Sequence, residues 1–150
     1  KRNSMGNKQI TEEMKKMILA PFPKEAVTAH PTKTFLTSIK AQYIIERLND
    51  VFGTGGWNSS SKIVHESEKA VVMEVTLDFG KWDILPITHY GGATIKDKQD
   101  LGDIYKSAKT DGVTKCASIL GIGMDVFKGL VKPGKAETSA TKAQADNDIL

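Results

Sequence analysis

The most regular hydrophobic pattern in the chain runs from Asp100 to Gly123 and predicts one long helix. Apolar and small residues recur there at spacings of three, four and seven, which places them on one helical face. They are Leu101, Ile104, Tyr105, Ala108, Gly112, Cys116 and Ile119. A second, narrower apolar strip consists of Val113, Ala117 and Leu120. A helix that is apolar on two sides is usually buried on two sides, so we expect it at the centre of the fold.

Both ends of this helix carry residues that commonly begin and end helices. Asp100 or Asp103 can cap its start, and Gly121 or Gly123 can end it. Gly112 lies in mid-helix, where glycine costs about 1 kcal/mol relative to alanine. We expect this cost to be offset by close packing of the helix backbone against another element, such as a sheet.

Two shorter helices are predicted in the first third of the chain. The first covers residues 11–19 with Thr11 as its cap, and Pro21 and Pro23 end it by forcing an extended segment. Residues 24–36 are predicted to form a loop or arm. The second helix covers residues 39–52, with Thr37 or Ser38 as its cap, and the glycines at positions 53–56 end it. Its apolar side carries Tyr43, Ile44, Leu48, Val51 and Phe52.

Alternation of apolar and polar residues predicts three strands, at residues 57–64, 70–79 and 82–90. The short connections between them favour an antiparallel meander. Pro86 cannot donate to a ladder, so the third strand is expected to be an edge strand or to carry a bulge there. Residues 91–93 are expected to turn the chain into the long helix.

This order of elements predicts an α+β domain, with helices on one face of a small antiparallel three-stranded sheet. We divide the chain into an N-terminal helix and extension at 1–19, a core domain at 20–130 and a flexible or neighbour-packing tail at 131–150. The length of 150 residues is sufficient for one domain with a real core. No apolar run approaches the roughly 20 residues that a membrane span needs, so no membrane contact is expected.

Charge and cysteine content change this picture only slightly. The formal net charge of +3 is too small to identify a partner by itself, although lysines are concentrated in the second half of the chain. The single cysteine, Cys116, cannot form an internal disulfide, and we expect a reducing, cytoplasmic location. The lysines of the long helix are consistent either with a solvated scaffold helix or with a binding surface.

The sequence lacks the common signatures of catalysis. The glycines at 53–56 are not followed by Lys and Ser or Thr, and they end a helix where a phosphate-binding loop would begin one, so ATP hydrolysis is not expected. The three histidines are far apart, and one cysteine cannot make a zinc site. An enzyme using Asp83, His65 or His89 remains an alternative. The mixture of lysines with tyrosines and tryptophans favours instead a protein that binds single-stranded nucleic acid, because lysines contact phosphates and aromatic rings stack on bases.

Two sequence blocks carry a resemblance to a known family. The block from Tyr43 to Trp57, YIIERLNDVFGTGGW, resembles the helix-then-FGxxGW signature of the Rad-fifty-two-type single-strand annealing proteins. The block from Lys106 to Gly121 is similar to the K-x-A-x-T-D-G-x-K-R-A signature of the same family. Residues 20–23, APFP, are similar to the start of its bacterial and phage branch, which includes DdrA.

The resemblance implies a β-β-β-α core whose protomers assemble into rings or open arcs. It implies ATP-independent binding of single-stranded DNA and annealing of complementary strands in homologous recombination and DNA repair, without a cofactor or a metal. Other copies of the chain are the implied partners, with a single-strand-binding protein or an exonuclease as further partners, and the implied location is the nucleoid. A ring that protects single-stranded ends without annealing them is the alternative within the same class.

The resemblance also indicates where DNA-binding residues are expected, and this sequence departs from the family pattern at several of those positions. The basic pair that follows the family's glycine is Thr114-Lys115 here, a later basic position is Ser118, and a groove arginine of the first block falls at Tyr43. The aromatic residue that follows Phe-Gly in the family is Thr54. The predicted DNA-binding residues are Lys40, Tyr43, Arg47, Lys96, Lys98, Lys106, Lys109, Thr114 and Lys115.

Overall fold

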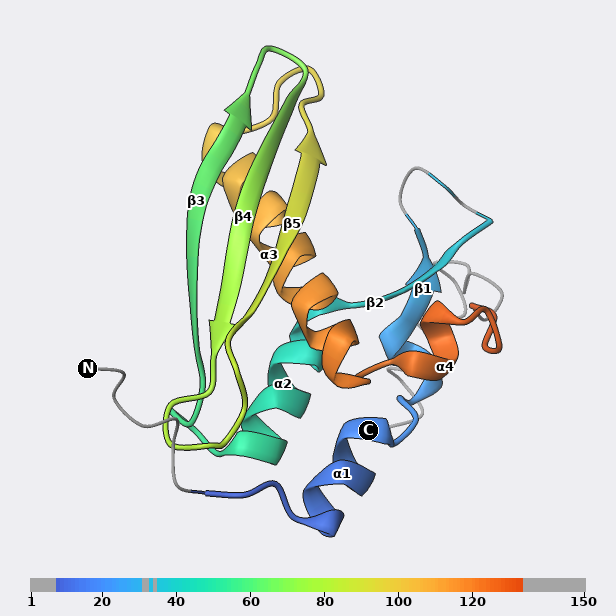
Figure 1. The fold of residues 1–150 in the computed structure, drawn as a ribbon. Coiled ribbons are helices and arrows are strands. Elements are labelled where there is room, and N and C mark those ends of the chain that lie inside the picture. Colours follow the sequence, from blue (N-terminus) through green and yellow to red (C-terminus); the bar gives the residue numbers. More distant parts are fainter. Residues whose placement is uncertain (1–7, 31–32, 34, 134–150) are drawn as a thin grey trace, which may run out of the picture.

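The computed structural model describes residues 8–30, 33 and 35–133 (Figure 1). The predicted tail therefore lies outside the described residues from position 134 on, as do the first seven residues of the predicted extension. The elements, in chain order, are α1 (Glu12–Leu19), a 3-10 turn (Lys24–Ala26), β1 (Val27–Ala29), β2 (Thr37–Ile39), α2 (Ala41–Phe52), β3 (Asn58–Glu66), β4 (Ala70–Asp78), β5 (Ile87–Thr94), α3 (Leu101–Leu120) and α4 (Met124–Phe127).

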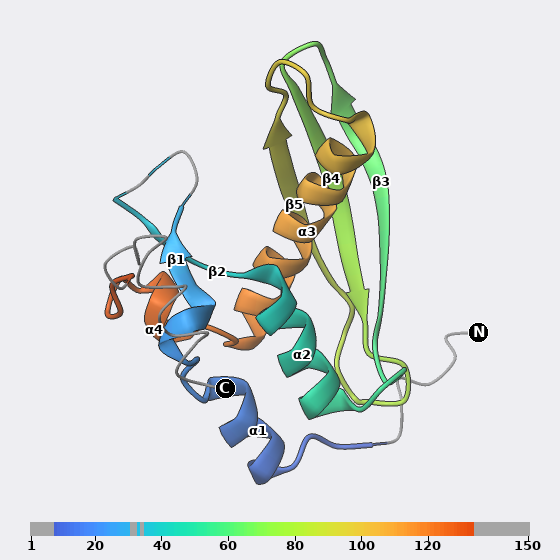
Figure 2. The same ribbon diagram turned by 180° about the vertical axis from the view of Figure 1, so that it is seen from behind.

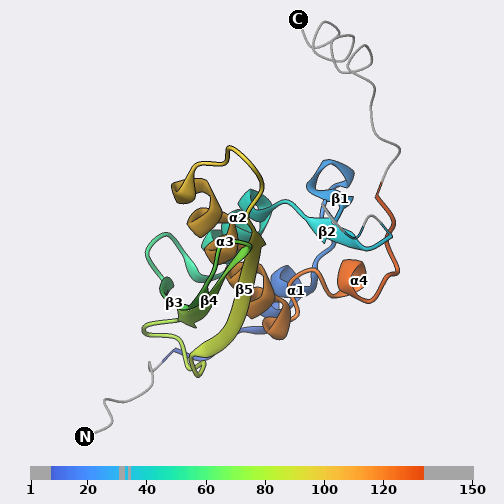
Figure 3. The same ribbon diagram turned by 90° about the horizontal axis from the view of Figure 1, so that it is seen from above.

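The main sheet is the predicted antiparallel meander, in the order β3-β4-β5. Its central strand β4 buries every second side chain, and these residues define what we call the inner face of the sheet. They are Val71, Met73, Val75 and Leu77. The helices α2 and α3 lie on the same side of this sheet (Figures 2 and 3), which confirms the predicted α+β arrangement.

A close approach of two glycines fixes α3 on the sheet. A Cβ atom added to Gly91 of β5 would lie 2.1 Å from the carbonyl oxygen of Ala108 and 2.2 Å from the backbone nitrogen of Gly112. A Cβ atom added to Gly112 would lie 2.4 Å from Cγ2 of Val75. The expected close packing at Gly112 is therefore confirmed, and its partners are the two strands β4 and β5.

The long helix begins and ends as predicted. Asp100 caps it, because its Oδ1 accepts a hydrogen bond from the backbone N–H of Gly102 at 2.9 Å, and Gly121 ends it with a φ of 106°. Cys116 lies buried on its apolar face and donates its thiol hydrogen to the carbonyl oxygen of Val75, and burial raises the pKa of that thiol. The predicted burial of the apolar face is wrong for two residues, Leu101 and Ile119. Both lie near the helix ends, and each is 56% exposed.

The segment before α2 differs from the prediction. Residues 27–29 and 37–39 form a two-stranded antiparallel hairpin, β1-β2, where a loop or arm was expected. Thr37 and Ser38 belong to β2 and do not cap α2; the helix starts at Ala41 after Lys40, which makes no side-chain cap. Because residues 37–39 pair with β1 in an extended ladder, the helix begins only after them, at Ala41.

The third strand is also displaced from its predicted position. It starts at Ile87, directly after Pro86, and it continues through Gly91 to Thr94, where a turn was expected. The residues before Pro86 instead cross the end of the sheet, where Trp82 forms a bridge with Lys8 and its indole N–H donates to the carbonyl oxygen of Phe52 at 3.2 Å. The pair of glycines predicted a turn, but Gly91 allows the close approach of α3 and Gly92 pairs with Val72 in the sheet.

One arginine joins the first two helices. The guanidinium of Arg47 in α2 donates to the carbonyl oxygens of Met17 at 2.9 Å, Ala20 at 2.7 Å and Pro21 at 3.3 Å, and it lies 4.1 Å from the ring centroid of Phe22. The carbonyls of Met17 and Ala20 lie at the C-terminal end of α1, where carbonyl groups lack partners within the helix and a cation is stabilising. Burial lowers the pKa of this guanidinium, while nearby carboxylates act in the opposite direction. Arg47 therefore holds the turn after α1 against α2.

None of the helices in the described residues is both long enough and apolar enough to cross a bilayer.

We expect Gly91→Ala to lower the free energy of unfolding by about 1–3 kcal/mol, because its Cβ would meet backbone atoms of α3 that cannot rotate away. Gly92→Ala is the matched control, since its Cβ would lie 3.7 Å from the nearest atom, the carbonyl oxygen of Val71. Urea titration of both variants measures the effect. Equal stabilities would show that α3 does not approach the sheet at Gly91.

Replacing Arg47 with alanine should lower the free energy of unfolding by about 1–3 kcal/mol, the range for hydrogen bonds to a charged group. Gln42→Ala, an exposed position on the same helix, is the control and should change it by less than about 0.5 kcal/mol. Thermal unfolding followed by circular dichroism compares the two. An Arg47 variant as stable as the control would mean that the observed bonds contribute nothing to the fold.

Candidate nucleic-acid interface

The inner face of the sheet is only partly covered by helices. The strand β3 pairs Ile63 with Met73 and Ser61 with Val75, so these β3 side chains share the face of buried β4 residues. Nevertheless Ile63 is 45% exposed, and Ser61 is exposed as well. The helix α3 packs on β4 and β5 and leaves the inner side of β3 open to solvent (Figure 2).

A hollow of about 230 Å³ lies where this open strip meets the helices. It is lined by Ala41 and Ile45 of α2, by Trp57 and Ser59 at the start of β3, and by Lys109, Thr110, Val113 and Thr114 of α3. We call this hollow, together with the inner side chains Ser59, Ser61 and Ile63 of β3, the α3–β3 groove. It brings together residues from three segments of the chain.

The chemistry of the groove combines an apolar floor with donors of hydrogen bonds. Val113 is buried, and the half-buried Lys109 places a cation beside the hydroxyl groups of Thr110 and Thr114. Lys106 precedes Lys109 by three positions and Thr110 by four, so it lies on the same side of the helix, one turn along the groove. Among the described residues that line the hollow there is no carboxylate. Such a surface suits an extended polyanion with apolar bases.

The two ends of the groove are defined by other contacts. At one end α2 closes it through Ala41 and Ile45. At the other end the hydroxyl of Tyr105 in α3 donates to Oε1 of Glu66, the last residue of β3. The hydrogen bond to Glu66 raises the pKa of Tyr105, with burial and the carboxylate charge acting in the same direction. On α3, the groove therefore lies between this contact at Tyr105 and the lining residue Thr114.

The indole of Trp57 forms part of the groove wall. Its ring N–H donates to Oδ1 of Asn49 in α2 at 2.7 Å, which fixes the ring beside the hollow. The side chain is half-buried and packs against the core, as expected for this residue. An aromatic ring that is held in place and partly exposed can also stack on a base.

Lys115 lies on the other side of α3 from the groove. Its ammonium pairs with Oδ2 of Asp111 at 2.9 Å, and the same oxygen accepts the backbone N–H of Gly92 in β5 at 3.0 Å. Because β3 and β5 flank β4 on opposite sides, Thr114 and Lys115 face different edges of the sheet although they are adjacent. The structure thus separates the two residues of the predicted basic-pair position.

The other predicted contacts are spread over the molecule. Lys40 precedes Ala41 and so lies near the closed end of the groove, and Tyr43 packs against the core. Arg47 is engaged with the end of α1. Lys96 and Lys98 are exposed in the connection between β5 and α3, beyond the far end of the sheet. Of the nine predicted residues, the groove therefore gathers Lys106, Lys109 and Thr114, with Lys40 next to it.

Several groove residues were not predicted from the sequence. Ser59, Ser61 and Thr110 carry the hydroxyl groups, and Ile63 supplies apolar surface. A signal for the serines was present: the run Asn58–Lys62 is unusually polar for a predicted strand and indicates a strand face that no helix covers. Thr110 lies one turn before Thr114, so helical spacing alone places the two hydroxyls side by side.

The residues of the enzyme alternative are not brought together. His65 pairs with Val72 on the outer face of the sheet, whereas His89 pairs with the inward-facing Val75. Asp83 lies in the connection before β5 and accepts a hydrogen bond from Gln9 at 2.7 Å. In the described part of the chain no group of three or more His, Cys, Asp or Glu side chains could hold a metal ion.

Comparison with known proteins bears on the whole fold rather than on single residues. The model of the family described as Rad52/22 family double-strand break repair protein matches residues 8–128. We found no significant match to an individual curated protein. The resemblance to the bacterial and phage branch therefore stays a prediction. Since the match covers most of the 150 residues, including the glycine-Trp57 block and all of α3, the chain belongs to the Rad52/22 family of double-strand break repair proteins.

Proposed function

We propose that this protein binds single-stranded DNA along the α3–β3 groove and anneals complementary strands during recombination and repair, without ATP. The family is one of double-strand break repair proteins, and such repair requires handling of single strands. The single observation that carries the proposal is the uncovered inner side of β3 opposite Lys109. It creates an open surface beside a hollow that has Lys109 on one wall and no carboxylate among its described lining residues.

In this proposal, the affinity for DNA comes mainly from electrostatic attraction between lysines and phosphates. Lys106, Lys109 and Lys40 would neutralise phosphates along the groove, while Thr114 and Ser59 donate hydrogen bonds to phosphate oxygens. The hydroxyl of Thr110 donates to the carbonyl oxygen of Lys106 within the helix and so acts as polar surface only. These contacts carry no sequence information, which suits a protein that must act on any broken end. Nothing in this chemistry consumes a nucleotide, so the protein would act as a binding protein and not as an enzyme.

Annealing requires that bound bases remain accessible to a second strand. The groove has one wall on α3 and one on β3 and opens to solvent along Ser61 and Ile63. A backbone held against α3 would leave its bases directed outward, ready to pair. End protection without annealing is the neighbouring hypothesis, which would need the bases to be covered.

The proposal includes assembly into a homo-oligomeric ring or arc. Large apolar side chains are exposed on the β1–β2 hairpin and near α1 and α4: Phe35 is 77% exposed, Leu130 is 74% and Leu19 is 60%. Apolar side chains exposed to this extent often mark contacts with other chains. A single-strand-binding protein or an exonuclease would be a further partner, and the cell's nucleoid the site of action.

Lys109→Ala should weaken binding to a single-stranded oligonucleotide by about tenfold or more, the loss expected for one charge-assisted contact. It should also make the slope of log affinity against log salt shallower by about 0.7, the value for one phosphate on a single strand. Fluorescence anisotropy titrations at several salt concentrations measure both quantities.

Lys16→Ala removes an equal charge from the exposed side of α1 and serves as the control. Lys115→Ala removes a lysine that is already paired with Asp111 and lies on the β5 side of α3, so it should cost less affinity than Lys109→Ala. If Lys109→Ala behaved like Lys16→Ala while Lys115→Ala lost binding, the strand would follow the β5 side instead.

We expect the protein to accelerate the pairing of two complementary oligonucleotides without added nucleotide. Donor and acceptor dyes on the two strands report pairing in real time. Binding of each strand without faster pairing would reject annealing and favour end protection.

The purified protein should sediment as a large homo-oligomer at micromolar concentration. Substitution of the exposed Phe35 and Leu130 by serine should shift this distribution towards smaller species, because both apolar side chains would be buried between copies. Sedimentation velocity of the two proteins tests this. A monomer in the unsubstituted protein, with and without DNA, would contradict the proposed assembly.

A further inference from the structure

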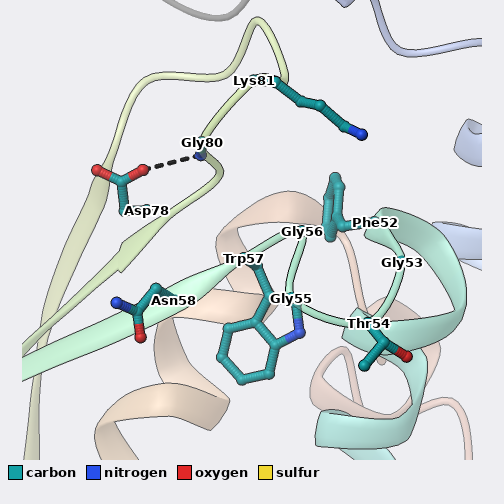
Figure 4. A pocket seen from close by; sticks show the side chains of 10 residues that line it. All are labelled: Phe52, Gly53, Thr54, Gly55, Gly56, Trp57, Asn58, Asp78, Gly80 and Lys81. Carbon is teal, nitrogen blue, oxygen red and sulfur yellow. Dashed lines mark hydrogen bonds between the residues drawn. The ribbon is translucent and has the colours of Figure 1, made fainter.

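A second and larger hollow, of about 320 Å³, lies beside the α3–β3 groove. One of its walls is the glycine turn at residues 53–56, between α2 and β3, and the opposite wall is formed by Asp78, Gly80 and Lys81 at the end of β4 (Figure 4). We call it the glycine-turn hollow. Phe52, Trp57 and Asn58 complete its lining.

Trp57 is the residue that joins the two hollows. It lines both of them, and its hydrogen bond to Asn49 fixes the ring between them. Ser59 follows on the groove side, whereas Asn58 lies in the glycine-turn hollow. Trp57 is therefore the point at which the groove and the second hollow meet.

The glycine turn offers backbone to a ligand without side chains in the way. Gly53 and Gly55 have φ angles of 85° and 76°, which favour glycine, and a Cβ at either position would find no atom within 4 Å. Thr54 between them is exposed and takes the place where the resemblance implied an aromatic side chain. The wall is thus low and open, and a planar base can approach it closely.

Lys81 brings a positive charge to the hollow, and Lys8 lies next to it. The ammonium groups of Lys8 and Lys81 lie 5.3 Å and 6.0 Å from the ring centroid of Trp82. The backbone N–H of Lys8 donates to the carbonyl oxygen of Lys81 at 3.0 Å, which holds the two residues side by side. Neither ammonium takes part in a salt bridge between the residues that the structure describes.

One carboxylate opposes these cations. Asp78 lines the hollow, but its Oδ1 accepts the backbone N–H of Gly80 at 2.8 Å, which directs that oxygen towards its own turn. Of the lining residues, Lys81 carries a positive charge and Asp78 a negative one, so Lys81 is the cation that the hollow offers to a phosphate. A volume near 320 Å³ is at the lower end of the range of about 300–1,000 Å³ for ligand sites, which suits a single base and its phosphate.

We infer that the glycine-turn hollow is a second subsite for the same DNA strand. A nucleotide that leaves the α3–β3 groove stacks on or passes over Trp57, its base enters the hollow against the glycine turn, and its phosphate contacts Lys81. This inference rests on the proposed function, because it extends the path of a strand that the groove must first bind. It assigns a DNA contact to Lys81 and places Thr54 in the lining of the subsite.

A length series of single-stranded oligonucleotides tests the inference. The shortest strands that bind should occupy the groove alone, and longer strands should reach the second hollow. Lys81→Ala should therefore bind the shortest strands like the unsubstituted protein and bind longer ones at least threefold more weakly. Thr54→Glu, which places a negative charge in the hollow, should show the same dependence on length. Lys109→Ala should be impaired at every length.

Two controls keep the result interpretable. Lys81→Arg retains the charge and should restore binding of long strands, and thermal unfolding confirms that each variant is folded. If Lys81→Ala and Thr54→Glu match the unsubstituted protein at all lengths while Lys109→Ala is impaired, the second subsite is wrong and the groove stands. If the unsubstituted protein binds no strand of any length, the proposed function itself is overturned, and the inference with it.

Discussion

The architecture depends on the contact between two glycine backbones, Gly91 in β5 and Gly112 in α3. Because no Cβ atom separates them, α3 lies directly on β5 and β4 and is held there by the buried side chains around Val75. A helix in that position cannot also cover β3, which pairs with the other edge of β4. The open inner side of β3, and therefore the α3–β3 groove, follows from this one close approach.

The two sides of α3 have consequently different chemistry. On the β5 side, Asp111 accepts the N–H of Gly92 and pairs with Lys115, so charge is neutralised within the protein and a backbone donor of the sheet edge is occupied. On the β3 side, Lys109 and the threonine hydroxyls face an open strand without a carboxylate among the described residues that line the hollow. A polyanion would therefore be attracted to the β3 side, and the same helix serves as scaffold on one side and as binding wall on the other.

Much of the fold could be predicted from periodicity, because it follows from local rules. The caps Thr11 and Asp100, the stop at Gly121 and the buried alternation in β4 were all readable from the sequence. The hairpin β1–β2 and the course of β5 were not. In β5, Gly91 and Gly92 are turn residues by local rules, but both belong to the strand, and α3 packs on Gly91. The candidate site was predicted only in part. Helical spacing groups Lys106 with Lys109, but the uncovered side of β3 and the hydrogen bonds of Arg47 to α1 arise only when the elements pack together.

The central claim is that a single strand of DNA lies between α3 and the inner side of β3. The most direct test is an electron cryomicroscopy structure of the protein bound to an oligothymidine strand, in which the path of the phosphates can be traced. The account predicts density along Lys106, Lys109 and Thr114, opposite Ser59 and Ser61. Density along the outer face of the sheet beside Glu74 and Tyr90, or along β5 beside Lys115, with an empty groove, would contradict it.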